Sequence, residues 1–288
     1  MEASSKKNHR IAHYSLQCNG ILLSLDTPKI MGVINLSPDS FYAGSRLQHI
    51  SDILTMAEKM LQDGAAILDL GAQSTRPGSE RLGEDEELHR LIGAVEALHK
   101  EFPEAILSID TYLPKVARLS VTAGASIIND ISGGGSDDEM LETVSLLGVP
   151  YICMHMRGNP GTMHKQQPYD DIGIEVMDYF IQKIARCQAA GIKDLVLDPG
   201  FGFSKNIDDN FRLLHELPAL CLMGKPLLAG ISRKSTIYKT LGITPEEALN
   251  GSTVLHTICL LNGARILRVH DVLEAVEAVK LVGRVVGV

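Results

Sequence analysis

The feature that most constrains this chain is a series of eight short apolar runs, each followed by a longer stretch with helical periodicity. Every run is almost continuously apolar, which is typical of parallel strands covered on both faces. The series fills the chain from about residue 29 to its end without a linker. It predicts eight β-then-α units, with strands KIMGVINL (29–36), AAILDLG (65–71), AILSIDT (105–111), SIIND (126–130), PYICMHM (150–156), DLVLDPG (194–200), KPLLAGI (225–231) and ARILRVH (264–270).

The stretches between these runs carry apolar stripes at helical spacing. Residues 50–62 and 84–100 show such stripes, and the second begins with four acidic side chains, where the helix dipole favours negative charge. Further long helices are predicted over 172–190, 245–261 and 271–285. The pattern favours a (β/α)₈ TIM barrel. A doubly wound sheet is the competing architecture, but it rarely needs eight strands that are each followed by a helix.

The predicted barrel takes up residues 29–288 as one domain, and residues 1–28 precede it as an N-terminal extension. Two short alternating pieces, AHYSLQC and ILLSL, flank Asn19-Gly20 in this extension. An Asn-Gly pair between such pieces is typical of a tight hairpin turn. We therefore expect a short β-hairpin that plugs the N-terminal end of the barrel.

Charge and cysteine usage narrow the class of protein. The net charge is −8 and the isoelectric point is near 5.7, so no nucleic-acid partner is expected, because phosphate backbones need a basic surface. No run reaches the roughly 18 apolar residues that a membrane helix needs, so no membrane association is expected. The five cysteines are scattered and odd in number, which is typical of a reduced intracellular protein. We expect a cytoplasmic location.

Polar residues follow all eight predicted strands. A (β/α)₈ barrel places its active site at the carboxyl ends of its strands, so these residues belong together. Any one of them could simply mark where a strand meets water, but eight polar strand ends predict a polar pocket. The residues are Asn35, Asp69, Ser74, Thr75, Arg76, Asp110, Asn129, Asp130, His155, Arg157, Asp198, Ser232, Arg233, Lys234, Ser235, Arg268, His270 and Asp271.

The carboxylates and amides of this set suggest a flat heterocyclic ligand. Asp110, Asn129, Asp198 and Lys234 could exchange hydrogen bonds with a ring rich in N–H and C=O groups. A buried aspartate can bind a guanidine-like edge through two parallel charge-assisted hydrogen bonds, and a pterin has such an edge.

The cations suggest a second, anionic part of the ligand. Arg76, Lys234, Arg268 and His270 could surround a pyrophosphate. Asn35 offers a hard oxygen of the kind that magnesium prefers, and magnesium usually keeps waters and binds phosphate oxygens as well. The loops over 35–46 and 71–80 are rich in turn formers and long enough to serve as lids.

The chain resembles the dihydropteroate synthases across nearly its whole length. The resemblance is carried by seven motifs in order, each at a predicted strand end. They are NLSPDSF (35–41), STRPG (74–78), SIDT (108–111), IND (128–130), LDPGFGF (197–203), GISRKS (230–235) and RVHD (268–271).

The resemblance implies a transferase of folate biosynthesis. Such an enzyme condenses 6-hydroxymethyl-7,8-dihydropterin pyrophosphate with p-aminobenzoate and gives 7,8-dihydropteroate and pyrophosphate. It also implies a pterin-binding TIM barrel, Mg²⁺ as cofactor, a homodimer and a family that sulfonamides target. No covalent enzyme intermediate is required.

The resemblance also implies roles for single residues. Asp110, Lys234 and Arg268 would be catalytic, with ionised Asp110 stabilising positive charge on the pterin methylene. The pterin would be held by Asp110, Asn129, Asp198, Lys234 and Arg268, the pyrophosphate by Asn35, Arg76, Arg268 and His270, the metal by Asn35, and p-aminobenzoate by Phe41, Thr75, Arg76, Pro77, Phe203 and Ser235.

One position departs from the family pattern, which usually has a glutamate before STRPG. This chain has Gln73 there. An amide can still form hydrogen bonds but cannot balance a nearby cation, so a role that needs a carboxylate at this position is in doubt.

Two other functions are compatible with a pterin-binding barrel. A methyltetrahydrofolate:corrinoid methyltransferase would share the Asp/Asn/Asp contacts, but it would not need STRPG, the SRKS lysine or a cation cluster for pyrophosphate. A non-catalytic barrel that only binds a pterin would not need the two intact loops.

Overall fold

The computed structural model describes residues 13–36, 46–73, 82–135, 138–158 and 169–287. Within them, eight parallel strands form one sheet in the order β8-β7-β6-β5-β4-β3-β10-β9. Each strand carries the apolar run expected of it, shortened at its ends. The strands are β3 (Lys29–Asn35), β4 (Ile67–Gly71), β5 (Ile106–Asp110), β6 (Ile127–Asp130), β7 (Tyr151–Met154), β8 (Leu195–Asp198), β9 (Leu228–Ala229) and β10 (Ile266–Val269).

The sheet curls into a nearly closed barrel. β10 pairs with β3 over four residues and with β9 over two. Between β8 and β9 there is one isolated parallel bridge, Leu197 to Leu227, and the backbone N–H of Leu197 donates to the carbonyl of Pro226 at 3.0 Å. The predicted (β/α)₈ barrel is confirmed.

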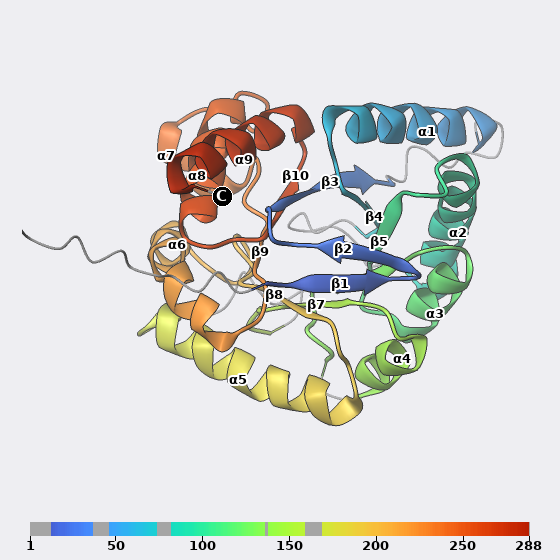
Figure 1. Ribbon diagram of the computed structural model, residues 1–288, viewed down its shortest axis with the longest axis horizontal. Coiled ribbons are helices and arrows are strands. Elements are labelled where there is room, and N and C mark those ends of the chain that lie inside the picture. Colours follow the sequence, from blue (N-terminus) through green and yellow to red (C-terminus); the bar gives the residue numbers. More distant parts are fainter. Residues whose placement is uncertain (1–12, 37–45, 74–81, 136–137, 159–168, 288) are drawn as a thin grey trace, which may run out of the picture.

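The helices form a ring around the strands in sequence order (Figure 1). Their inner faces and the outer faces of the strands build the larger apolar core of the molecule. The described helices are α1 (Arg46–Asp63), α2 (Glu84–Glu101), α3 (Pro114–Thr122), α4 (Glu139–Leu147), α5 (Ile172–Ala190), α6 (Ile207–Leu220), the 3₁₀ turn η3 (Cys221–Met223), α7 (Ser235–Leu241), α8 (Leu249–Leu261) and α9 (Val272–Val286).

One predicted helix boundary is wrong. The helix expected over 245–261 begins only at Leu249. The carbonyls of Pro245 and Glu246 instead accept hydrogen bonds from the Arg233 side chain at 2.9 and 2.6 Å. Residues 245–248 therefore form a turn that serves the loop after β9.

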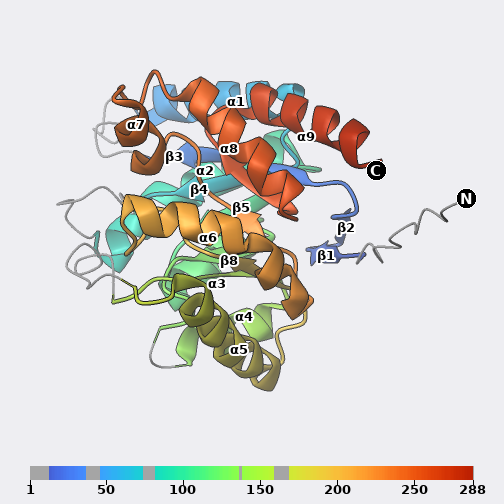
Figure 2. The same cartoon turned by 90° about the vertical axis from the view of Figure 1, so that its left-hand side faces the viewer.

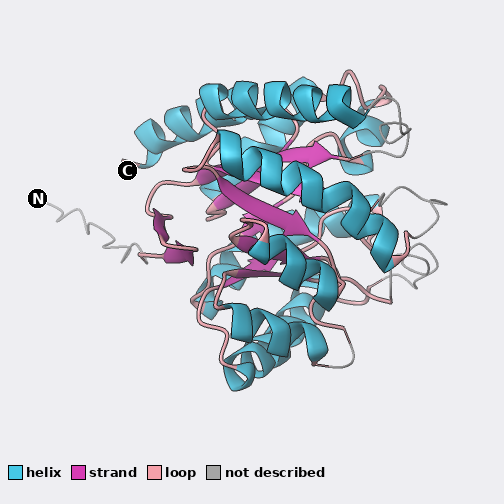
Figure 3. Ribbon diagram, turned by 90° about the vertical axis from the view of Figure 1, so that its right-hand side faces the viewer, coloured by secondary structure: helices cyan, strands magenta, loops and turns pink. Residues whose placement is uncertain are grey.

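The predicted hairpin is present as β1 (Ser15–Cys18) and β2 (Ile21–Ser24), which pair antiparallel around Asn19 and Gly20. Both turn residues have positive φ, 47° and 94°, which Asn and Gly adopt most readily. The hairpin lies across the centre of the helix ring in Figure 1 and at one end of the barrel in Figure 2. The strand arrows in Figure 3 point away from it, so it covers the end where the strands begin.

The barrel interior has an apolar lower layer. Leu16, Cys18 and Leu25 of the N-terminal segment pack on it, so the hairpin seals this end as expected. The layer takes one side chain from each strand: Met31, Ile67, Ile106, Ile127, Ile152, Val196, Leu228 and Ile266.

Two residues further along each strand, side chains point inward again, because strands alternate with period two. Five of these eight positions are polar. This upper layer consists of Val33, Asp69, Ser108, Asn129, Met154, Asp198, Gly230 and Arg268. The polar residues of the barrel interior therefore lie above a closed apolar floor, at the end where a (β/α)₈ barrel places its chemistry.

Candidate active site

Arg268 lies at the centre of the polar layer and joins two carboxylates. Its Nε donates to Oδ2 of Asp69 at 2.7 Å, and its Nη2 donates to Oδ2 of Asp110 at 2.8 Å. The Asp69 side chain is fully buried, whereas that of Arg268 keeps 21% of its surface exposed. The guanidinium is thus held in a fixed orientation by two carboxylates, and part of its surface stays exposed.

Asn129 sits beside this ion pair and is 2% exposed. Its Nδ2 donates weakly to both oxygens of Asp69, at 3.3 and 3.4 Å. Its Oδ1 is buried and has no hydrogen-bond partner within the protein. A buried carbonyl oxygen without a donor is costly, so this atom is an acceptor ready for a ligand N–H.

Asp198 ends β8 and is held by the turn that follows it. The N–H of Gly200 donates to Asp198 Oδ1 at 2.8 Å. Gly200 has φ +71°, and a Cβ there would lie 2.1 Å from the carbonyl oxygen of His155, so the turn requires glycine. Burial raises the pKa of Asp198, while the nearby Lys234 and Arg268 cations oppose this effect.

Lys234 reaches the same pocket from the loop after β9. Its Nζ donates to the carbonyl of Phe201 and lies 4.4 Å from the centre of the Phe203 ring. Burial lowers the pKa of Lys234 to about 8, and Asp198 and Asp110 oppose the shift because they favour the ammonium. The Lys234 ammonium therefore lies close enough to both carboxylates to interact with them electrostatically.

Asp110 is a strongly perturbed carboxylate of the site. Burial raises its pKa to about 7, the Arg268 guanidinium opposes the shift, and the carboxylates of Asp69, Glu87 and Asp130 add to it. Asp110 therefore titrates close to neutral pH, as groups in catalytic sites often do.

The five residues predicted to hold a pterin thus lie near one another at the polar end of the barrel interior. Asp110 and Arg268 are in direct contact, Asn129 joins them through Asp69, and Lys234 lies close enough to Asp198 and Asp110 to interact with them electrostatically.

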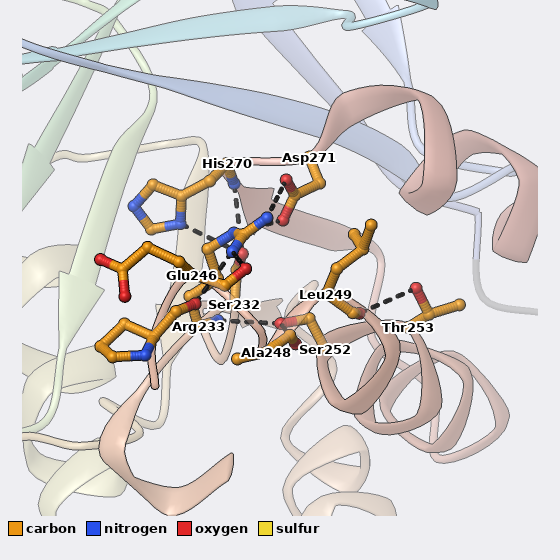
Figure 4. A network of polar contacts seen from close by, with 10 residues as sticks. Ser232, Arg233, Glu246, Ala248, Leu249, Ser252, Thr253, His270 and Asp271 are labelled. Atoms are coloured by element: carbon orange, nitrogen blue, oxygen red, sulfur yellow. Dashed lines mark hydrogen bonds and ion pairs between the residues drawn. The ribbon is translucent and has the colours of Figure 1, made fainter. Parts of the chain in front are cut away.

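A second polar network fixes the loops after β9 and β10 (Figure 4). Arg233, which has φ 53°, forms two hydrogen bonds to Asp271 at 2.9 and 2.8 Å, and its backbone N–H donates to Ser252 Oγ at 2.9 Å. The Arg233 side chain is therefore ion-paired within the protein. Its backbone, with positive φ, comes directly before Lys234, which is the N-cap residue of α7.

His270 belongs to the same network and is exposed at the mouth of the barrel. Its Nδ1 lies 3.1 Å from Ser232 Oγ, and its backbone N–H donates to the same oxygen at 3.3 Å. Desolvation and the neighbouring Arg268 lower the pKa of His270. The ring can thus meet a ligand at the rim as a neutral donor or acceptor.

The remaining predicted site residues divide into two groups. Asn35 is the exposed last residue of β3, Phe203 lies against the Lys234 ammonium, and Ser235 begins α7. The others lie outside the described residues: Phe41, Thr75, Arg76 and Pro77.

The residues present fit a magnesium ion that the protein holds with few ligands. No group of three His, Cys, Asp or Glu side chains in the described ranges is arranged to hold a metal ion. Asn35 supplies one amide oxygen beside Gly71, and Gly71 is in register with Asp110. Magnesium commonly binds one or two protein oxygens and completes its shell with waters and substrate phosphates.

Gln73 takes part in a buried hydrogen-bond network. Its Nε2 donates to Glu87 Oε2 at 2.7 Å and to the carbonyl of Leu82 at 3.1 Å, while its Oε1 accepts from the N–H of Leu82 at 3.2 Å. Glu87 is fully buried and also accepts from Thr111 Oγ1 at 2.5 Å. The amide at position 73 therefore satisfies a buried carboxylate that stands next to the Asp110 segment.

The sequence motifs do not indicate the structural roles of two residues of the site, Asp69 and Lys205. Asp69 was noted as a strand end but received no role, although it holds both Arg268 and Asn129. Lys205 was not noted at all. Its Nζ lies 3.0 Å from His155 Nδ1 and donates to the carbonyls of Gly200 and Phe203 at 3.0 and 3.1 Å. The motif LDPGFGF could have been extended by two residues to include it.

The comparisons with known proteins agree with this geometry. The family described as pterin binding enzyme matches residues 31–270. The chain belongs to this family of pterin-binding barrels.

Within the family, its relatives are dihydropteroate synthases. The chain is 45% identical over 269 residues to the dihydropteroate synthase of Escherichia coli (strain K12), covering 93% of this chain and 95% of the relative. It is 38% identical to that of Haemophilus influenzae, covering 92% and 97%. The chain is thus a transferase of the dihydropteroate synthase group.

Solved structures show the same relationship. The Yersinia pestis dihydropteroate synthase in a sulfonamide drug complex superposes with a TM-score of 0.89 at 40% identity, covering 96% of this chain and all (100%) of the other. The Xanthomonas albilineans dihydropteroate synthase with 4-aminobenzoic acid gives 0.87 at 39% identity, covering 95% and 98%. The methyltransferase and the non-catalytic barrel are therefore set aside.

Proposed function

We propose that this chain condenses 6-hydroxymethyl-7,8-dihydropterin pyrophosphate with p-aminobenzoate to give 7,8-dihydropteroate and pyrophosphate. The observation that carries the proposal is the cluster of Asp110, Asn129, Asp198, Lys234 and Arg268 above the apolar floor. This cluster combines acceptors for a ring with N–H groups and cations for a leaving anion. The activity of the relatives supports the same conclusion.

The pterin ring would lie deep in the pocket. The Asp198 carboxylate and Asn129 Oδ1 are acceptors for N–H groups of the ring, and the Lys234 ammonium is a donor for its carbonyl or ring nitrogen. Because water is excluded there, each charge-assisted hydrogen bond is stronger than it would be in solution.

The pyrophosphate would lie toward the mouth, near Arg268 and His270, with Arg76 as a further predicted contact. Asn35 would hold Mg²⁺, which supplies charge to the pyrophosphate oxygens as negative charge grows on them. The guanidinium of Arg268 acts on the same charge, and its orientation is already fixed by Asp69 and Asp110. Such preorganised charge is the main source of stabilisation when a leaving group departs.

The reaction needs no covalent intermediate with the protein. The bond between the pterin methylene carbon and the pyrophosphate oxygen breaks, and the electron pair leaves with the oxygen. The nitrogen of p-aminobenzoate then forms the new C–N bond and loses one proton, which the released pyrophosphate can accept. The ionised Asp110 carboxylate stabilises the positive charge that spreads from the methylene into the ring.

The p-aminobenzoate would lie near Phe203 and Ser235, with Phe41, Thr75, Arg76 and Pro77 as further predicted contacts. We expect a sulfonamide to compete for this position, which the sulfonamide complex of the Yersinia pestis enzyme supports. A sulfonamide should raise the KM for p-aminobenzoate without changing kcat.

The decisive assay follows p-aminobenzoate-dependent release of pyrophosphate by the purified chain, with Mg²⁺ and with the metal chelated. We expect turnover that requires both p-aminobenzoate and Mg²⁺. A matched control is Arg212→Ala, because this arginine lies on the outside of α6 and its side chain is 63% exposed. Release of pyrophosphate at the same rate with and without p-aminobenzoate, or no turnover at all, would refute the proposed reaction.

We also propose that the chain is a cytoplasmic homodimer. No helix in the described part of the chain is long and apolar enough to cross a membrane, and all five cysteines are free thiols, which suits a reducing compartment. A hollow of about 250 Å³ lies between α8 and α9. Leu281 and Val285 beside it are 70% and 79% exposed, and such an apolar patch is typical of an interface between two copies.

The oligomeric state can be tested by light scattering after size exclusion. The wild-type chain should run at twice the 31.3 kDa of one copy, and Leu281→Glu should run as a monomer. Leu146→Glu is the matched control, because Leu146 lies in the last turn of α4, away from this hollow, and is 89% exposed. A wild-type monomer would contradict the dimer.

A further inference from the structure

We propose that Asp69 is a positioning residue that fixes which way the Asn129 amide faces, and so makes the pocket select a ring with an N–H at that point. The inference rests on the proposed function, because it names how that site recognises its pterin. Asp69 does not touch the ligand in this scheme. It acts through Asn129 and Arg268.

The first observation is the position of the carboxylate. Asp69 is fully buried in the upper layer, between β3 and β5, and its Oδ2 accepts from Arg268 Nε at 2.7 Å. Both of its oxygens also lie within 3.4 Å of Asn129 Nδ2. One carboxylate therefore holds an amide and a guanidinium at the same time.

The second observation is the free atom of Asn129. A carboxylate has lone pairs and no proton to donate, so only the NH₂ end of an amide can face it favourably. The carbonyl end must then point away from Asp69. This Oδ1 is buried without a partner within the protein, so it is available to accept from a ligand N–H.

The consequence is a rule for recognition. An acceptor of fixed orientation favours a ring nitrogen that carries a proton and disfavours one that presents a lone pair. A site built to satisfy a buried polar group discriminates strongly against ligands that leave it unpaired. The Asp69 charge thus sets the specificity of a contact that Asn129 makes.

Arg268 depends on the same carboxylate through a different atom. Asp69 holds Nε and Asp110 holds Nη2, so the plane of the guanidinium is fixed by two anchors. Substitution of Asp69 should therefore affect pterin binding through Asn129 and turnover through Arg268. These two effects can be measured separately.

The test is a reciprocal exchange between positions 69 and 129. In Asp69→Asn the neighbour of Asn129 can donate as well as accept, so the orientation of the Asn129 amide is no longer determined. Asn129→Asp places a second carboxylate about 3.3–3.4 Å from the first. In the double variant Asp69→Asn/Asn129→Asp, the new amide can donate to the new carboxylate and still accept from Arg268, while one oxygen at 129 faces the ligand.

Calorimetric titration with 7,8-dihydropteroate measures the binding effect without requiring turnover. We expect each single variant to lose roughly 10–100-fold in affinity, the range for a hydrogen bond to a charged group. The double variant should bind at least about tenfold more tightly than Asn129→Asp alone. The KM for p-aminobenzoate should change little in all three variants.

Ser120→Ala is the structural control, because Ser120 is buried in α3, outside the barrel interior, and its Oγ has no hydrogen-bond partner within the protein. It should bind like the wild type. Circular dichroism and thermal melting establish that each variant is folded, and an unfolded Asn129→Asp that regains its fold in the double variant also supports the coupling. Independent, additive losses, or normal affinity in folded Asp69→Asn, would overturn the inference.

This outcome is separable from a failure of the proposed function. If the wild-type chain binds dihydropteroate but gives no turnover, the proposed reaction fails and the exchange still tests Asp69. If turnover is normal and the reciprocal exchange shows no coupling between positions 69 and 129, the proposed reaction is supported and the positioning role of Asp69 is refuted.

Discussion

The two layers of the barrel interior lie next to each other on the same strands but differ in polarity. The lower layer, from Met31 to Ile266, is entirely apolar and is sealed by the hairpin. The upper layer lies two residues further along the same strands and holds an arginine, two aspartates and an asparagine. The lower layer stabilises the fold by burying apolar surface, whereas buried ion pairs contribute little net stability. The same strands thus serve stability at one level and chemistry at the next.

The largest effect is expected for Arg268→Ala in the upper layer. The variant loses a charge aimed at the leaving pyrophosphate, so kcat/KM should fall by about 10²–10³. It also leaves Asp69 and Asp110 without their cation, and the free energy of unfolding should fall by about 3–5 kcal/mol. Steady-state kinetics and urea denaturation measure the two losses. Near-normal turnover of the folded variant would remove Arg268 from the mechanism.

A lower-layer substitution should separate the two functions. Ile127→Ala opens a cavity under the site, and the free energy of unfolding should fall by about 2–5 kcal/mol. Since no polar contact of the pocket is altered, kcat/KM of the folded protein should stay within about threefold of the wild type. A loss of activity as large as that of Arg268→Ala would show that the layers are not independent.

The polar groups at and beyond the upper layer, and not the lower layer, should give the activity its pH dependence. Asp110 must be ionised and its pKa is about 7, while Lys234 must be protonated and its pKa is about 8. The logarithm of kcat/KM should therefore rise with pH below about 7, fall above about 8, and change about tenfold per unit on each limb. Asp110→Asn should remove the acidic limb. A flat profile from pH 5 to 9 would contradict this assignment.

The smallest effect is expected just outside the barrel interior, at Gln73→Glu. Burial raises the pKa of Glu87, so its contribution to stability is present at pH values below the ordinary glutamate pKa and is lost as pH rises. A second carboxylate beside it should enlarge this loss. We expect the variant to be about 1 kcal/mol less stable than the wild type near pH 8 and nearly equal near pH 5. Gln62→Glu, on the surface of α1, is the control.

Much of this comparison could be read from the sequence. Nearly continuous apolar runs are typical of strands buried on both faces, so the sequence predicts all eight strands in the correct order. Period two then places Asp110, Asn129 and Asp198 inward at the carboxyl ends. The predicted run KPLLAGI, however, pairs over only two residues, Leu228–Ala229, because apolar character reports burial and not the extent of a hydrogen-bonded ladder.

The partners of the polar residues could not be predicted. Asp69 meets Arg268 across 199 positions of sequence, and Lys205 meets His155 across 50. Such pairs depend on side-chain reach inside the closed barrel. The motifs showed which residues carry the chemistry, whereas the residues that orient them became visible only with their contacts.

β8 and β9 are joined by one isolated bridge, Leu197 to Leu227, so this seam has the fewest ladder pairs between neighbouring strands of the barrel. Asp198 follows one side of the seam and Lys234 the other, so its opening would change the spacing of two groups that face the same ligand. Backbone amides along this seam should exchange with deuterium faster than those between β3 and β4, and a bound pterin should slow them by clamping both edges together. Substrate binding is therefore expected to stabilise the closed form of the barrel at its weakest strand pair.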